Sequence, residues 1–206
     1  RPRQALAICL SALAGYVDAI GFLSADRYFV SFMSGNTTRL AVELMTTPAQ
    51  ALIPALLLAG FTLGVAIGGV IAALAGAWRK PAVLALVTLL LLVAASSHAT
   101  DRHGLATAAM VLAMGAVNNT FQRNGEVAVG LTYMTGTLVK IGQYFVAALK
   151  GGDHSRWLKY LSLWAMISVG GVCGAIAYHV LGLPSLWIAT GLMAVWTVLA
   201  TRRDRR

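Results

Sequence analysis

The chain alternates between long apolar runs and short polar segments, a pattern that predicts helices crossing a membrane. The apolar runs are about 17 to 25 residues long, the length that a helix needs to cross about 30 Å of hydrocarbon at about 1.5 Å per residue. Short strands of alternating polarity are missing from the pattern, which favours a helical bundle over a β-barrel. The pattern predicts eight segments, at about 4–23, 28–45, 51–78, 81–95, 105–121, 127–149, 157–180 and from 184 onward.

Composition supports this interpretation and excludes an ordinary soluble domain. Of the 206 residues, 58% are apolar and 11% are charged, and the mean hydropathy is +0.75. A soluble domain carries about 25% charged residues, which it needs to remain in water. We therefore expect an all-α integral membrane protein whose main partner is the lipid bilayer.

The net charge of +9 does not indicate a nucleic-acid partner. The basic residues gather at the ends of the apolar segments and form no stripe with interleaved aromatic residues. This distribution is typical of topology signals in membrane proteins. The residues concerned are Arg1, Arg3, Arg79, Lys80, Lys150, Arg156, Lys159, Arg202, Arg203, Arg205 and Arg206.

A polar decapeptide with a central glycine interrupts the apolar pattern at 31–40, and a similar decapeptide occurs at 132–141. The first reads SFMSGNTTRL and the second TYMTGTLVKI, with seven of ten positions identical or similar in chemistry. Other landmarks repeat in the same order: residues 15–19 match 115–119, 68–70 match 170–172, and a proline opens both 81–95 and the last segment. We therefore expect one membrane domain over 1–206, made of two homologous halves at about 4–98 and 104–201.

The two halves can be parallel or inverted, depending on whether the polar segments 28–45 and 127–149 cross the membrane. If they are broken or re-entrant, each half crosses three times and the halves are inverted, as in many transporters. With the N-terminus inside, this arrangement places twelve Lys and Arg residues inside and two outside, whereas eight crossings in a parallel repeat place ten inside and four outside. The positive-inside rule favours the inverted three-plus-three bundle with both termini in the cytoplasm, and eight crossings remain the alternative.

The repeated decapeptides are the predicted site. Gly35 and Gly136 would let the chain break, and a new helix could then begin with Ser34 or Asn36 as its N-cap. A helix that begins at membrane depth offers free N–H groups and the positive end of its dipole, which favour an anion or the acceptor end of a polar solute. A basic residue four positions after each glycine would add a full charge. The predicted solute-binding residues are Ser34, Gly35, Asn36, Thr37, Arg39, Thr135, Gly136, Thr137 and Lys140.

Asp18 and Asn118 occupy matching positions in the two halves, each inside an apolar segment. Polar residues at such positions favour a functional site, so we expect them to act in coupling or gating, with an ordinary interhelical hydrogen bond as the alternative. The decapeptides also allow a simpler interpretation. Small residues of this kind are common helix-packing material in membranes, and Arg39 could pair with Glu43 at the i, i+4 spacing.

The grouping His98, Asp101 and His103 is the one cluster with metal-ligand residue types, and it lies in a short polar loop. A solvated loop explains it more simply than a metal site. Patterns for a nucleophile elbow, a phosphate loop or a zinc protease do not occur, so we expect no enzyme, no cofactor and no metal. Cys9 and Cys173 lie in apolar runs and fit small packing residues.

Two further expectations concern packing. Gly60, Gly64 and Gly68 follow one another at four-residue spacing, which lets membrane helices approach closely. This stripe leaves room for a homodimer, although packing within the chain explains it equally well. The segment 81–95 is almost purely Leu, Val and Ala and is expected to face lipid.

The run GYVDAIGF at 15–22, followed by FVSFMSGNTT at 29–38, resembles the signature of the YoaK family of bacterial inner-membrane proteins, whose function is unassigned. The resemblance covers essentially the whole chain, including the second Met-Thr-Gly-Thr at 134–137. It implies a compact multi-spanning protein of the bacterial inner membrane and supplies no catalytic residues.

These patterns predict a small secondary transporter or channel-like permease for a small polar or anionic solute. Its site would lie at the two glycine-centred breaks near the bilayer midplane. The alternatives are a membrane enzyme that uses the His98, Asp101 and His103 loop, and a non-transporting scaffold.

Overall fold

The computed structural model describes residues 2–97, 102–123, 126–127 and 131–204, and almost all of them are helical. In chain order the elements are α1 (Pro2–Ser24), α2 (Met33–Thr46), α3 (Leu52–Ala75), η1 (Gly76–Trp78), α4 (Arg79–Ser97), α5 (His103–Ala116), η3 (Val117–Thr120), β1 (Gln122–Arg123), β2 (Glu126–Val127), α6 (Met134–Leu149), α7 (Arg156–Leu181), η4 (Leu183–Ser185) and α8 (Leu186–Asp204). The strands β1 and β2 form one short antiparallel pair.

Four helical stretches in the described chain are long and apolar enough to cross a membrane: 4–24, 52–97, 156–181 and 183–202. The stretch 52–97 contains both α3 and α4, which are joined by η1, beginning at Gly76. Gly76 has a φ of +52° and Gly182, between α7 and α8, has a φ of +67°. Glycine adopts this left-handed conformation without the steric cost of a side chain, so the chain can turn between α3 and α4 and between α7 and α8. The prediction of an all-α membrane protein is confirmed.

Two close helix crossings hold the bundle together. In the first, α1 packs along α7, and a Cβ added at Gly15, Gly170 or Gly174 would collide with backbone atoms of the other helix. In the second, α5 packs along α3, where Gly64 and Gly115 are in the same situation. Apolar side chains gain little by leaving lipid for protein, so membrane helices associate through the close packing that small residues permit. The Gly60, Gly64 and Gly68 stripe therefore serves a contact within the chain.

The expectation that the segment 81–95 faces lipid is wrong for one of its two faces. Val83, Leu84, Val87 and Leu91 of α4 are completely buried, because α4 packs against both α5 and α8. The Thr88 and Thr197 hydroxyls lie 3.0 Å apart across the α4–α8 contact. The opposite face of α4 carries exposed apolar side chains at Leu89, Leu92 and Val93. A uniformly apolar helix gives no periodic signal that separates its protein face from its lipid face.

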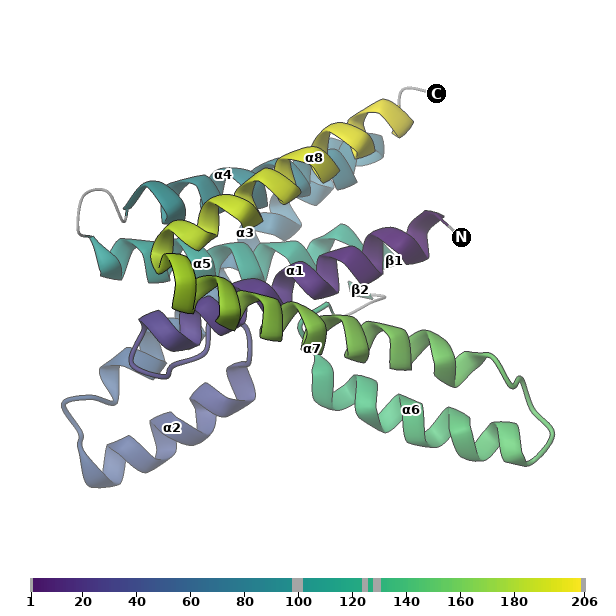
Figure 1. Cartoon of the computed structure of the whole chain (residues 1–206), viewed down its shortest axis with the longest axis horizontal. Coiled ribbons are helices and arrows are strands. Elements are labelled where there is room, and N and C mark those ends of the chain that lie inside the picture. The colour runs from purple at the N-terminus through teal and green to yellow at the C-terminus, as the bar shows by residue number, and fades with distance from the viewer. Residues whose placement is uncertain (1, 98–101, 124–125, 128–130, 205–206) are drawn as a thin grey trace.

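The helices α2 and α6 stand apart from the main bundle, on the same side of it and toward opposite ends, while both chain termini lie at one end (Figure 1). They contain 14 and 16 residues, which is about 21 Å and about 24 Å at about 1.5 Å per residue. Both lengths fall short of the hydrocarbon thickness of about 30 Å. The helix α5 also has 14 residues, but η3 continues it directly to Thr120. Each helix packs mainly on the helix that follows it, α2 on α3 and α6 on α7.

Candidate functional site

A cavity of about 340 Å³ lies where the beginnings of both decapeptides meet the α1–α7 crossing. Its lining residues are Gly15, Asp18, Ala19 and Phe22 of α1, Phe29, Ser31 and Phe32 before α2, Thr132 and Met134 at the start of α6, and Ile167 and Gly171 of α7. The volume lies at the small end of the range for ligand pockets, and its apolar wall with a few polar groups is typical of them.

Asp18 supplies the ionisable group of this lining and also anchors the segment that leads into α2. Its Oδ1 atom accepts hydrogen bonds from the backbone N–H groups of Val30, at 2.9 Å, and Ser31, at 2.7 Å. The Ser31 hydroxyl and the Phe32 backbone N–H also interact with this carboxylate. A carboxylate offers about four acceptor positions, so the protein itself supplies donors for most of them. Because an ionisable group inside a membrane-spanning helix is costly, its retention here marks a candidate functional position.

Asn118 makes the corresponding contact in the second half, but it does not line the cavity. Its Nδ2 group donates to Thr132 Oγ1, at 3.1 Å, and to the carbonyl of Met114, at 2.9 Å. The Thr132 hydroxyl in turn lies 3.3 Å from Asn118 Oδ1. In each half, a polar residue of the first helix therefore holds the start of the decapeptide: Asp18 holds Ser31, and Asn118 holds Thr132. Thr132 itself lines the cavity.

The helix breaks expected at Gly35 and Gly136 are instead found just before Met33 and Met134. The helices begin at Met33 and Met134, with Phe32 and Tyr133 at the N-cap positions and no capping side-chain hydrogen bond, so the prediction of Ser34 or Asn36 as N-cap is wrong. Each glycine lies in the first helical turn, where the ring of Phe32 or Tyr133 occupies the space that a Cβ would need. Each glycine therefore leaves room for the aromatic ring of the N-cap residue three positions earlier. The irregular backbone lies before the helix begins.

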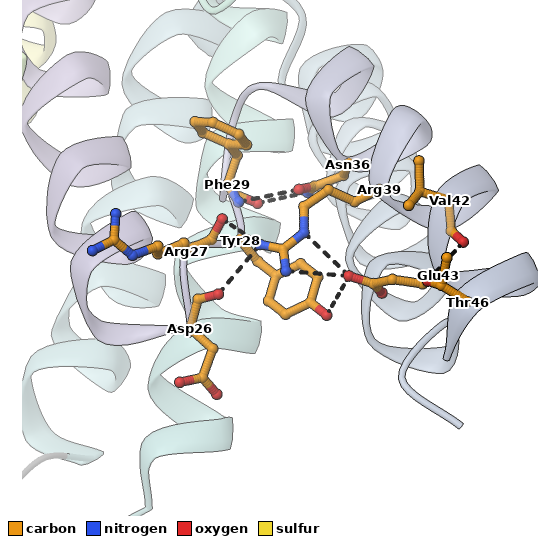
Figure 2. Close-up of polar contacts among 9 residues, drawn as sticks. All are labelled: Asp26, Arg27, Tyr28, Phe29, Asn36, Arg39, Val42, Glu43 and Thr46. Atoms are coloured by element: carbon orange, nitrogen blue, oxygen red, sulfur yellow. Dashed lines mark hydrogen bonds and ion pairs between the residues drawn. The ribbon is translucent and has the colours of Figure 1, made fainter. Parts of the chain in front are cut away.

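The Arg39 guanidinium is bound by other residues of the protein and does not line the cavity. Its Nε and Nη2 atoms lie 3.2 and 3.1 Å from Glu43 Oε1, and its Nη1 donates to the carbonyls of Asp26 and Arg27 at 3.2 and 2.6 Å. The Tyr28 hydroxyl donates to the same Glu43 oxygen at 2.8 Å. Figure 2 shows the guanidinium lying over the Tyr28 ring, with its Cζ 3.6 Å from the ring centroid. The i, i+4 pair is therefore present, and it ties α2 to the segment before it.

Lys140 lies on the contact between α6 and α7. Its Nζ atom is 5.3 Å from the centroid of the Tyr160 ring, which stacks on Tyr144 at a centroid distance of 5.3 Å. The Cζ atom of Arg156 lies 5.3 Å from the centroid of the Tyr144 ring. Neither Arg39 nor Lys140 lines the cavity, so the structure gives no support to an anionic solute there.

The remaining predicted residues support the two short helices. Asn36 is completely buried and forms a reciprocal pair with the Phe29 backbone, donating to its carbonyl at 2.7 Å and accepting from its N–H at 3.1 Å. The Thr37 and Thr137 hydroxyls donate to the carbonyls of Met33 and Tyr133, four residues earlier. Ser34 and Thr135 are exposed. Of the predicted site residues, Asp18 alone is in the cavity lining.

Sequence reasoning missed most of the cavity wall. The aromatic residues Phe22, Phe29 and Phe32 and the hydroxyl residues Ser31 and Thr132 line the cavity. A sequence signal existed for the last three, which lie at the start of the repeated decapeptides. Phe22 and Phe29 give no comparable signal, because an apolar residue in a membrane segment can equally face lipid, protein or a cavity.

The grouping His98, Asp101 and His103, for which the sequence favours a solvated loop, lies largely outside the described residues, because His98 and Asp101 are not among them. His103 opens α5 and is exposed. Within the described chain, no group of three or more His, Cys, Asp and Glu residues could hold a metal ion.

The fold and the site together define a small all-α integral membrane protein with a partly open, carboxylate-bearing pocket at the α1–α7 crossing. The chain belongs to the family described as protein of unknown function (DUF1275), whose model matches residues 6–199. It is also 35% identical over 202 residues to UPF0700 transmembrane protein RA0705 of Rhizobium meliloti (strain 1021), covering 98% of this chain and 88% of that protein. No solved structure matches the chain. The expectation of an uncharacterised membrane family is confirmed, and the YoaK name stays a prediction.

Proposed function

We propose that this protein is a small permease that carries a small polar solute across the bacterial inner membrane and has no enzymatic activity. The observation that carries the proposal is the cavity between α1, α7 and the starts of α2 and α6, into which both repeated motifs contribute. Transporters built from repeats place their substrate site near the midplane, where interrupted helices of the two halves meet. Irregular backbone at membrane depth is tolerated where it lines such a cavity.

The proposal includes an inverted three-plus-three topology with both termini in the cytoplasm. Figure 1 supports it, because α1 and α5 run in opposite directions, as do α3 and α7, and α4 and α8. In both close crossings the first helix of one half packs on the third helix of the other half, α1 on α7 and α5 on α3. In this arrangement α2 and α6 are the two segments that do not span.

A cavity-filling substitution tests the pathway. Ala19 lines the cavity, and Ala19→Phe places a large ring in it. With the protein reconstituted in liposomes, we expect at least one of a set of radiolabelled cationic, neutral and anionic small polar solutes to enter faster than in protein-free liposomes. Ala19→Phe should slow that uptake about tenfold or more, since overfilling a packed site costs about 1–3 kcal/mol.

The matched control is Ala66→Phe, which adds the same ring at an exposed position of α3. It should retain wild-type uptake. If no solute enters faster with the wild-type protein than with Ala19→Phe, the permease proposal fails and a non-transporting scaffold is the better account.

A further inference from the structure

We propose that the cavity selects a small organic cation, an amine or alkylammonium ion with a short apolar body. This selectivity rests on the proposed function where transport is concerned, but the binding step can be measured without transport. The chemistry follows from three features of the lining, namely one carboxylate, a row of aromatic rings and a pair of hydroxyl groups.

The carboxylate sets the sign of the charge. Among the lining residues Asp18 is the one with an ionisable side chain, and the remainder are Gly, Ala, Phe, Ser, Thr, Met and Ile. A charge held in a low-dielectric site is stabilised by an opposite charge at short range. The basic residues of the two decapeptides do not supply that charge, because Arg39 pairs with Glu43 and Lys140 lies over Tyr160. A cationic solute would supply the opposite charge that the Asp18 carboxylate lacks.

The aromatic rings form the second feature. Phe22 and Phe29 lie 4.8 Å apart between centroids, and Phe29 and Phe32 lie 5.1 Å apart in a T-shaped arrangement. All three line the cavity next to Asp18. The faces of aromatic rings carry partial negative charge, and ammonium groups bind to sites that combine several of them. An anion would meet repulsion from both the rings and the carboxylate.

The hydroxyl groups and the volume limit the size and type of the cation. Ser31 and Thr132 bring acceptor oxygens to the lining, which suits an ammonium group that still carries N–H donors. The cavity of about 340 Å³ holds a compact molecule rather than a long chain. Apolar contacts from Met134 and Ile167 fit a short hydrocarbon body.

The chain itself suggests how to separate charge from structure. Asp18 accepts two backbone N–H groups through one oxygen, and an amide oxygen can accept the same bonds. Asn118 occupies the matching position in the second half, where its amide bonds the Thr132 hydroxyl rather than backbone N–H groups, so an amide side chain has a precedent at this position. Asp18→Asn therefore removes the charge while it keeps the acceptor that holds the segment before α2.

The test is calorimetric titration of the full chain in lipid nanodiscs with three probes of nearly equal shape: isobutylammonium, isobutanol and isobutyrate. We expect isobutylammonium to bind about tenfold more tightly than isobutanol, with isobutyrate weakest. Asp18→Asn should remove that preference and leave isobutanol binding unchanged. Phe22→Leu should weaken the ammonium probe more than the alcohol, because it removes an aromatic ring and keeps an apolar side chain.

The control is Asp26→Asn, which removes an exposed carboxylate outside the cavity. Asp26 has a φ of +46°, a conformation that asparagine adopts readily. This variant should keep the wild-type preference for the ammonium probe. If Asp18→Asn does not fold, the probe series on the wild type and on Phe22→Leu still decides.

Equal binding of the three probes, or an unchanged preference in Asp18→Asn, would overturn the cation assignment. Failure of this inference is distinguishable from failure of the permease proposal. Selective binding of the ammonium probe without uptake in liposomes supports the cation site and contradicts transport. Uptake of a neutral solute without any preference for the cation supports transport and contradicts the cation site.

Discussion

Replacement of Gly170 by leucine is expected to destabilise the protein by about 3 kcal/mol, at the upper end of what overpacking usually costs. A Cβ at this position would collide with the backbone of Ala12 in α1, and backbone cannot move aside as a flexible side chain can. The α1–α7 crossing would have to open, and with it the wall of the cavity that Ile167 and Gly171 provide. The loss should appear as a lower thermal midpoint in detergent and as aggregation on size-exclusion chromatography.

Gly191 provides the control for that substitution. It lies in α8, and a Cβ there would meet no atom within 4 Å. Gly191→Leu should keep a wild-type thermal midpoint or raise it slightly, because leucine has the higher helix propensity. If both variants unfolded at the same temperature, the close crossing would not be a main source of stability.

Replacement of Arg39 by alanine is expected to cost about 3 kcal/mol, because it leaves the Glu43 carboxylate without its ionic partner. Glu43 is 6% exposed, and its Oε2 atom has no hydrogen-bond partner within the described structure. The carbonyls of Asp26 and Arg27 lose their donor at the same time. Thermal unfolding in nanodiscs measures the loss, and the ammonium probe should bind the folded fraction with unchanged affinity.

The double variant Arg39→Leu with Glu43→Leu decides whether this pair stabilises through its charges. The Glu43 side chain is buried and that of Arg39 is one-third exposed. Apolar replacement of both residues leaves no unpaired buried charge, so the double variant should be more stable than Arg39→Ala. If the effects of the two single leucine variants simply added, the two residues would act independently. If Arg39→Ala instead kept its stability and lost solute binding, Arg39 would belong to the binding site after all.

The general architecture was predictable because the membrane restricts the choices. Composition and run length indicated an all-α membrane bundle, and the glycine spacing in α3 indicated a close crossing. Both follow from physical limits on what can exist in hydrocarbon. The repeated landmarks also pointed to Asp18 and to the segments that line the cavity.

The details of the site were not predictable, for reasons that particular residues illustrate. The sequence favours a break at Gly35, because glycine lets the chain turn, whereas in the structure its missing side chain leaves room for the Phe32 ring. The spacing of Arg39 from Gly35, repeated by Lys140 after Gly136, predicts a common role in solute binding, whereas in the structure Arg39 pairs with Glu43 and Lys140 lies over Tyr160. In an apolar chain, partners within the protein decide what a polar residue does, and a single sequence does not contain those contacts.

The same limit applies to the apolar wall of the cavity. Lipid and protein interior are equally apolar, so the sequence does not separate Phe22, which lines the cavity, from Leu89, which is exposed on α4. In a soluble protein the periodicity of polar positions would make that distinction.

The central claim, that this cavity belongs to a solute pathway, is tested most directly by the water accessibility of Ala19→Cys. In a background with Cys9→Ser and Cys173→Ala, a membrane-impermeant cationic thiol reagent is added to either side of sealed liposomes. Thiolates react and thiols in hydrocarbon do not. We predict that Ala19→Cys is labelled from both sides, as alternating access requires, while Leu89→Cys on the lipid face of α4 is not. Labelling of Ala19→Cys from neither side, or from one side only, would contradict the account.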